Sequence, residues 1–473
     1  MPRRVGSANT RVAEGTVLTT ADRILADDIG YLSDVAAREP RDAEHLADNL
    51  REIYQAIFLV DLNNFQVDHV KAAAPRLMQS ILDLRIKVRS QISDWNARGL
   101  MTQEVQSALR DCFRASRYAG DLIGEVLLDH PRLAPEEQAF AGFAGAELNV
   151  MRPAVWHGKP LEFRPGDVIL QRGMLHNSAA IARIGDVDSQ FSHVGIVAQD
   201  ERGELVVVEA LIEVGSIITP LTVNLSHHLG RAILFRHRDG ALAARAAERI
   251  HERIAKSLEP TSKPILYDFS MELEGYKELF CSKLVRLAYE LGSDGKVSMP
   301  TFPTLVNMKN RDFPRRIGVT AHKTFAPGDV ELDPDFDVVA EWCDFRVTSE
   351  MRIKDMIMTK LFEWMDVYGY KFYPDLTVRL VALGGRLSSR LSKRAQELVA
   401  SVTGGVVPPN MTGNAIGAVA MLHRTAELIY KELELLETKS IRNSGRQLHP
   451  RQVLEILEQI RQRSGNRIGY LKR

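Results

Sequence analysis

The chain has 473 residues, of which 45% are hydrophobic and 26% are charged, a composition typical of globular proteins. This length predicts about two to four domains with a sizeable core. Lys and Arg together number 61, as do Asp and Glu, so the overall charge gives no indication of a nucleic acid or an anionic membrane as partner.

Three cysteines, Cys112, Cys281 and Cys343, are too few and too scattered for a disulfide framework or a zinc finger, and we expect no metal or other cofactor. The N-terminus has no apolar run of signal-peptide length, and no stretch of about eighteen apolar residues predicts a transmembrane helix. We therefore expect a cytoplasmic protein, while export by a route without a cleaved signal stays open. The oligomeric state is not predicted.

Residues 1–152 form a region that we expect to be helical. Apolar residues at helical spacing predict a first helix, and a second continues to a stop at Gly99. Thr102 is a plausible N-cap for a third helix, which ends before Pro131. The apolar positions of the first helix are Leu46, Leu50, Ile53, Ile57 and Val60. No motif in this region points to chemistry.

Residues 153–346 change to short strands separated by turns. Two predicted helices, "ALAARAAERIHERIAKSL" and "FCSKLVRLAYELG", follow the strands, and a further strand, "FDVVAEWCDF", closes the region. The order of strands and helices predicts an α+β fold. The strands, in chain order, are "PGDVILQ", "SHVGIVAQ", "ELVVVEAL", "GSIITPLTV" and "AILFRH".

Residues 347–473 are predicted to be helical again. The first helix is "TSEMRIKDMIMTKLFEWMDVYG", the second lies within 374–405, and two more follow the break "GGVVPPNMTGN". The second helix carries a basic run, which is more typical of a solvated helix face than of a lipid-binding patch. This run consists of Arg386, Arg390, Lys393 and Arg394.

Cys281 begins a predicted helix, and this position favours a reactive thiol. The helix dipole and the unpaired N–H groups of the first turn both stabilise thiolate. Cys112 lies in mid-helix and Cys343 in a strand, where this support is missing. Taken alone, Cys281 would more often be a buried and inert core cysteine.

His193 opens the strand "SHVGIVAQ", and Glu209 lies in an apolar run on the next strand. A histidine beside a thiolate acts as a base, and a carboxylate orients its ring. Taken alone, His193 would more often be a core or surface histidine, and Glu209 is as easily an ion-pair partner. His227 and His228 are alternative orienters, although loop positions suit them better. His176 lies in an insertion and His237 ends a strand, and no spacing supports a metal site.

The segments "RPGDVILQ", "SHVGIV", "VVVEA", "ILYDF" and "FCSKLVRLA" together resemble the permuted papain-fold hydrolases of the YaeF/YiiX type, relatives of the NlpC-type peptidases. The resemblance covers about residues 160–345 and implies a permuted papain-like core with an antiparallel sheet and a catalytic helix. It implies Cys281 as nucleophile, His193 as base and Glu209 as the third member. Tyr267 and Ser282 match residues of the family's cleft or oxyanion site.

Two features depart from the family pattern. Lys283 occupies a position where relatives often carry an acidic residue, and the insertion at 172–190 is long enough for a lid or a substrate wall. Asp167 and Asp268 lie at turn-like positions, where we expect them to cap or hold loops.

Three functions follow as alternatives. The resemblance implies a cysteine hydrolase that cleaves an amide bond in a peptide or cell-wall peptide through an acyl-enzyme. The same site would also suit an acyl lipid, as in a phospholipase or acyltransferase. The third alternative is a non-enzymatic binding module with its helical flanks as a docking platform.

Overall fold

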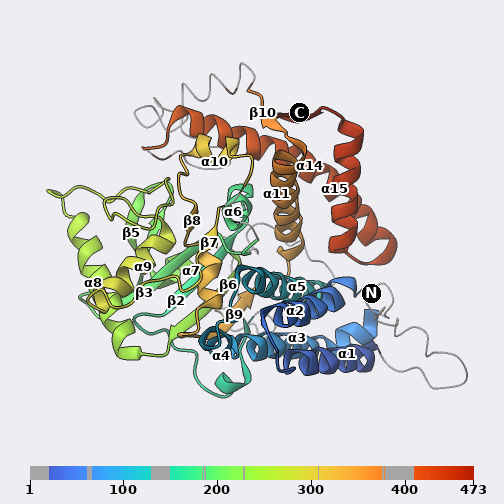
Figure 1. Ribbon diagram of the computed structural model, residues 1–473, viewed down its shortest axis with the longest axis horizontal. Helices are drawn as coiled ribbons and strands as arrows, with labels where there is room; N and C mark the ends of the chain where they lie inside the picture. The colour runs from blue at the N-terminus through green and yellow to red at the C-terminus, as the bar shows by residue number, and fades with distance from the viewer. Residues whose placement is uncertain are drawn as a thin grey trace, which may run out of the picture.

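The structure is a computed structural model in which the helical N-terminal part, a sheet with its own helices and the helical C-terminal part are distinct in Figure 1. Their order confirms the α+β class and the helical flanks that the sequence predicts. The boundaries expected at 152/153 and 346/347 stay predictions. The described residues are 21–60, 67–128, 150–183, 185, 188–226, 229–306, 308–374, 378, 408 and 410–473.

A seven-stranded sheet in which all neighbouring strands are antiparallel forms the centre, in the order β1-β9-β6-β2-β3-β4-β5. Its first strand lies before residue 153 and pairs with the last, so the sheet draws in the end of the N-terminal region. The strands are β1 (Val150–Met151), β2 (Val168–Gly173), β3 (His193–Gln199), β4 (Leu205–Leu211), β5 (Gly215–Pro220), β6 (Leu229–His237) and β9 (Phe336–Cys343).

Apolar residues fill both faces of the central strands, because helices cover both sides. Val194 and Val208 belong to the core shared with α8 (Gly240–Ser257) and α9 (Cys281–Gly292). On the opposite face, Val207 packs in a core that includes residues of α7 (Leu221–Ser226). Alternation along β4 therefore puts Glu209, two residues after Val207, on the face of α7.

The fifth predicted strand is shorter than expected. The sequence pattern extends it through "GSIITPLTV", but β5 ends at Pro220 and Leu221 begins α7. Proline has no N–H group to donate to a sheet ladder, which explains why the strand stops there.

The N-terminal helices pack against one another, with α2 and α3 on α5 and α1 against α3. Thr102 is the N-cap of α5, as predicted: the Val105 N–H group donates to Thr102 Oγ1 at 3.4 Å. The helices are α1 (Ala21–Ala36), α2 (Ala43–Leu59), α3 (Val67–Arg89), α4 (Ile92–Ala97) and α5 (Gln103–Leu127).

The C-terminal part adds a small three-stranded sheet to the predicted helices. Most of the helix expected within 374–405, including its basic run, lies outside the described residues. The elements are α11 (Thr348–Tyr368), β10 (Lys371–Phe372), α14 (Gly413–Ser444), α15 (Pro450–Ser464), β11 (Arg467–Ile468) and β12 (Leu471–Lys472).

The insertion at 172–190 contains α6 (His176–Ala182), which packs against α11 and α14. Ala179 and Ala180 are buried in the core of the C-terminal helices, and His176 Nε2 lies 3.1 Å from Glu427 Oε2. The described part of the insertion therefore joins the sheet to the C-terminal helices and does not form a free lid.

Short elements complete the middle region between α9 and β9. The hairpin β7–β8 and α10 lie on this stretch, and α10 packs against α14. They are β7 (Thr304–Leu305), α10 (Asp312–Ile317), β8 (Lys323–Thr324) and the 3₁₀ helix Pro327–Leu332, and another 3₁₀ helix, Ala154–Trp156, precedes β2.

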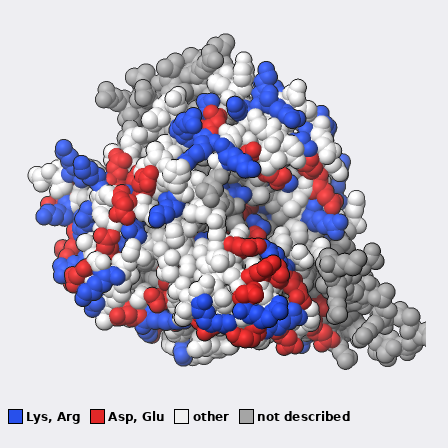
Figure 2. All heavy atoms as spheres, in the orientation of Figure 1, with Lys and Arg blue, Asp and Glu red and all other residues white. Residues whose placement is uncertain are grey.

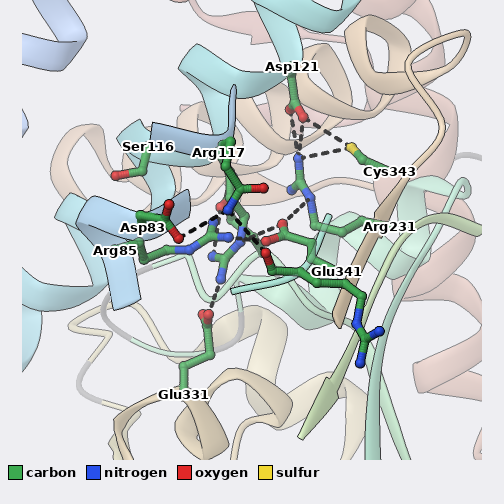
Figure 3. A network of polar contacts seen from close by, with 12 residues as sticks. Asp83, Arg85, Ser116, Arg117, Asp121, Arg231, Glu331, Glu341 and Cys343 are labelled. Carbon is green, nitrogen blue, oxygen red and sulfur yellow. Dashed lines mark hydrogen bonds and ion pairs between the residues drawn. The ribbon is translucent and has the colours of Figure 1, made fainter. Parts of the chain in front are cut away.

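A buried network of charged side chains joins the N-terminal helices to the sheet (Figure 3). Arg85 pairs with Glu341 of β9. Arg231 of β6 lies 2.6 Å from Asp121 of α5, and its Nε atom lies 3.7 Å from Glu341 Oε1. Arg117 Nε approaches the same Glu341 oxygen at 3.6 Å. Because each buried charge has a partner of opposite sign, the network tolerates burial.

On the face shown in Figure 2, acidic and basic side chains are intermixed, in keeping with equal numbers of the two signs in the sequence. Within the part of the chain that the structure describes, no helix combines the length and apolar character needed to cross a membrane.

Candidate active site

Cys281 is the first residue of α9, which packs against β3 and β4. Its N-cap, Phe280, offers no side-chain hydrogen bond to the helix. The N–H groups of a first helical turn have no acceptor within the helix, so they are available to a negative charge that develops beside the thiol. The tertiary structure thus confirms Cys281 at the helix start.

His193 is the first residue of β3, and Glu209 lies on the neighbouring strand. Gly195 pairs with Glu209 across the sheet, so Glu209 lies diagonally opposite His193. His193 Nε2 lies 2.7 Å from Glu209 Oε2. This contact uses Nε2 and leaves Nδ1 as the ring nitrogen for another partner. Glu209 is 1% exposed, whereas the His193 side chain is 18% exposed.

The thiol, the imidazole and the carboxylate interact with one another. Burial lowers the pKa of His193, but hydrogen bonds and opposite charge from Cys281 and Glu209 outweigh it and raise that pKa to about 10. Burial raises the pKa of Cys281, but His193 and the backbone of Val194 lower it below its ordinary value. The pair therefore favours thiolate and imidazolium.

Glu209 remains ionised despite its burial. Desolvation raises its pKa, but the hydrogen bond and charge of His193, together with further hydrogen bonds, lower the pKa below the usual value. An ionised carboxylate only accepts hydrogen bonds, so the Nε2–H group of His193 donates to Glu209. That fixes the tautomer and directs Nδ1 toward the thiol.

Tyr267 and Ser282 also lie at the thiol. The Tyr267 hydroxyl interacts with Cys281, and burial, followed by the charge of Cys281, raises the pKa of Tyr267 well above its ordinary value. Tyr267 is therefore a protonated donor at neutral pH. Ser282 Oγ lies 3.9 Å from Cys281 Sγ. All five residues singled out from the sequence thus come together in one site.

Two further polar residues support the site, and the sequence did not reveal them. Asn224 of α7 donates through Nδ2 to Glu209 Oε2 at 3.1 Å. Gln171 of β2 donates in turn to Asn224 Oδ1 at 2.7 Å. An asparagine in "LTVNLS" has no distinctive spacing, and only the packing of α7 over β4 brings it to Glu209.

Lys283, the departure from the family pattern, is a structural residue. Its Nζ lies 2.7 Å from Asp268 Oδ2 and donates to the Glu274 carbonyl at 2.9 Å. Asp268 also accepts from the Ser270 N–H group at 2.9 Å. The ion pair ties the chain after Tyr267 to the helix that carries Cys281, and Asp268 holds its loop as predicted.

Asp167 also holds a loop. It accepts from the Arg164 N–H group at 2.8 Å and pairs with Arg236 at 2.7 Å. Gly195, by contrast, has no room for a side chain on the β4 side, where an added Cβ would lie 2.5 Å from Val207.

The other cysteines have a different electrostatic environment. Burial raises the pKa of Cys112 to about 12. Burial, followed by the charge of Asp121, raises the pKa of Cys343 well above its ordinary value, and Cys343 Sγ lies 3.2 Å from Asp121 Oδ1. Both thiols are therefore held protonated.

The remaining histidines lie away from the Cys281 site or outside the described residues. His176 contacts α14, and His237 packs against Tyr289. His227 and His228, the alternative orienters, lie outside the described residues. Among the residues that the structure describes, no three His, Cys, Asp or Glu side chains are grouped to hold a metal ion.

Among the comparisons with known proteins, a match is found for the middle of the chain. A search of curated proteins finds no match. Residues 162–339, which contain Cys281, His193, Glu209 and Tyr267, match the family described as permuted papain-like amidase enzyme, YaeF/YiiX, C92 family.

Proposed function

We propose that the protein is a thiol hydrolase in which Cys281 attacks the carbonyl carbon of an amide and forms an acyl-enzyme. The observation that carries this proposal is the charged chain of contacts from Glu209 through His193 to Cys281 at the start of α9. A thiolate paired with an imidazolium is the form in which a cysteine acts as nucleophile.

In the first half of the reaction, the Cys281 thiolate forms a C–S bond and the carbonyl π electrons move to oxygen. The N–H groups at the start of α9 and the hydroxyls of Tyr267 and Ser282 are the donors that stabilise this oxyanion. The oxyanion collapses, the C–N bond breaks, and the imidazolium of His193 gives its proton to the leaving amine. A thioester on Cys281 remains.

In the second half, neutral His193 removes a proton from water, and the resulting hydroxide attacks the thioester carbon. The C–S bond breaks, the carboxylic acid product leaves, and the thiol shares its proton with His193 once more. Glu209 keeps the imidazole in one orientation and stabilises its charged form throughout the cycle.

The family match to amidases favours an amide in a peptide or cell-wall peptide as the substrate. A thiolate also attacks esters and thioesters, so an acyl lipid is the alternative substrate and a purely binding role is the alternative function. The cytoplasmic location stays a prediction.

The test is a comparison of the wild-type protein with Cys281→Ala on separate pools of peptides, muropeptides and phospholipids. We expect the wild type alone to consume members of a peptide or muropeptide pool. Intact-protein mass spectrometry after rapid acid quenching should show an acyl adduct, and fragmentation should place it on Cys281.

Cys343→Ala is the matched control, because it removes another buried thiol, at the end of strand β9 of the central sheet. It should retain turnover and the adduct. Turnover of phospholipid alone would support the lipid alternative, whereas identical behaviour of wild type and Cys281→Ala on all pools would favour a binding module.

A further inference from the structure

The chain that carries Tyr267 is held by three hydrogen bonds to three consecutive carbonyl groups. The Ser216 N–H group donates to the Ile265 carbonyl at 2.8 Å, and the Leu279 N–H group donates to the Leu266 carbonyl at 3.0 Å. The third donor is Asn410, whose Nδ2 lies 2.8 Å from the Tyr267 carbonyl oxygen. Three donors from separate segments therefore fix the position and orientation of the peptide groups in this stretch of backbone.

The first two donors lie inside the segment that matches the amidase family, but Asn410 lies 71 residues beyond its end at residue 339. Asn410 belongs to the turn before α14, where the Met411 N–H group donates to the Pro408 carbonyl at 3.2 Å. Thr412 then caps the helix by accepting from the Ala415 N–H group at 3.2 Å.

The position of Asn410 is set by the packing of the C-terminal helices. α14 packs against α11, α10 and α6, and Ile416 and Ala418 near its start are fully buried. In Figure 1, α14 extends along the top of the molecule directly above α10. The turn therefore lies at the end of an anchored helix and is a firm support for the backbone that it contacts.

The side chain of Tyr267 converts this backbone support into an effect on the thiol. Its hydroxyl interacts with Cys281, and the ring is 97% buried against neighbours such as Phe269, with ring centroids 5.2 Å apart. If the carbonyl loses its donor, the backbone at Tyr267 keeps only the hydrogen bonds of the two preceding carbonyls and shifts, and the hydroxyl at the far end of the ring moves with it.

We propose that Asn410 is a positioning residue of the Cys281 site, which acts through the backbone of Tyr267 and makes the C-terminal helical part a working component of the active site. This inference rests on the proposed function of that site. It also gives the C-terminal part a role that the family match, which ends at residue 339, does not supply.

The test uses Asn410→Leu in the full chain, which removes the donor without adding charge and nearly keeps the shape. Asn410→Gln retains an amide donor, and Asn414→Leu makes the same change at an exposed position in the first turn of α14. Each variant is made with Tyr267 and again with Tyr267→Phe, which lacks the hydroxyl.

The readout is the pH midpoint of Cys281 alkylation by iodoacetamide, together with kcat and KM on a substrate found for the wild type. A hydroxyl that donates to the thiolate lowers the midpoint, so Asn410→Leu should raise it by roughly half a pH unit, the scale of one hydrogen bond. We expect kcat to fall roughly three- to tenfold with little change in KM, on the same scale. Asn410→Gln should recover part of both losses, and Asn414→Leu should match the wild type.

In the Tyr267→Phe background, Asn410→Leu should cause no further shift, because the group through which it acts is already absent. An equal shift in both backgrounds, or an unchanged midpoint in Asn410→Leu, would overturn the proposal. Alkylation needs no turnover. If the midpoints follow this pattern and no pool is hydrolysed, the positioning role stands and the hydrolase proposal fails.

Discussion

Cys281 lies beside the central sheet and Cys343 ends its strand β9; both are buried, yet the pKa values of their thiols shift in opposite directions. The neighbour of Cys281 is His193, whose positive charge lowers the thiol pKa. Cys343 contacts Asp121, whose negative charge adds to burial and raises the thiol pKa, and this outweighs the opposing charge of Arg231, which lies 3.8 Å from Sγ. Both thiols are buried, so the sign of the neighbouring charge is what separates a thiol with a lowered pKa from one with a raised pKa.

The groups around the two thiols also differ: ion pairs surround Cys343, whereas Cys281 belongs to a group that shares a proton. Around Cys343, paired arginines and carboxylates hold α5 against β6 and β9 (Figure 3). Around Cys281, the Glu209–His193–Cys281 group has a proton that can move at accessible pH. The ion pairs join separate elements of the fold, whereas the movable proton is what proton transfer requires.

The largest expected effect is the difference in hydrolytic activity between the alanine variants of the two cysteines. Cys281→Ala should lower hydrolysis by roughly a thousandfold or more, because the nucleophile is lost. Cys343→Ala should retain activity to within about twofold, although it costs on the order of 1 kcal/mol of unfolding free energy with its buried contact to Asp121. Initial rates and urea denaturation measure both effects, and comparable loss of activity in the two variants would contradict the distinction.

Disrupting the buried charged network should lower the unfolding free energy of the protein. Arg231→Met leaves Asp121 without its buried ion-pair partner and removes one of the arginines that surround Glu341, so it should lower the unfolding free energy by about 3–5 kcal/mol. Arg238→Met is the matched control, because Arg238 pairs with Asp337 at the surface, where such a pair is worth about 0–1 kcal/mol. Urea unfolding followed by circular dichroism measures the difference. Equal losses would show that the network contributes no more than a surface ion pair.

Within the proposed catalytic group, a substitution should lower activity and largely preserve the unfolding free energy. Glu209→Gln preserves shape but removes the charge that stabilises the imidazolium, so kcat should fall by roughly a hundredfold. The pKa of His193 should fall with it, since the charge of Glu209 helps to raise that pKa. Steady-state rates and NMR titration of the His193 ring test the two statements. An unchanged His193 pKa would show that Glu209 does not act on the imidazole.

The pH dependence should distinguish the two partners of the thiolate–imidazolium pair. Because the pKa of Cys281 is lowered, its alkylation should rise with pH at lower pH than that of an ordinary thiol. Hydrolysis should fall as pH rises through about 10, where His193 loses the proton that it gives to the leaving amine.

His193→Ala should move the alkylation midpoint upward, since burial then acts on Cys281 without the opposing positive charge, and should slow alkylation near pH 7 by about tenfold. Rates of iodoacetamide labelling between pH 5 and pH 10 supply the measurement. An alkylation midpoint that does not move would show that His193 does not lower the pKa of Cys281.

Local sequence signals located most of the fold because they reflect short-range physics. The N-cap Thr102 and the apolar spacing from Leu46 to Ile57 depend on neighbours within a few turns, and both helices form, although Val60, expected within the first helix, is the C-cap of α2 and has an extended backbone. The end of β5 at Pro220 was missed, since the pattern of β-forming residues continues past the proline into α7. The length of the insertion predicted a lid or a substrate wall, and its contacts with α11 and α14 were not predicted because those helices lie far away in sequence.

The sequence by itself placed a cysteine at a helix start, a histidine at a strand start and a carboxylate in an apolar strand, and the resemblance to a family joined these local patterns into one expected site. Tertiary structure alone decided which residues support them. Asn224 reaches Glu209 because α7 folds over β4, and Asn410 reaches Tyr267 because α14 is anchored across the chain. Hydrogen bonds between distant segments leave no spacing in a sequence, since packing of whole elements sets their distances.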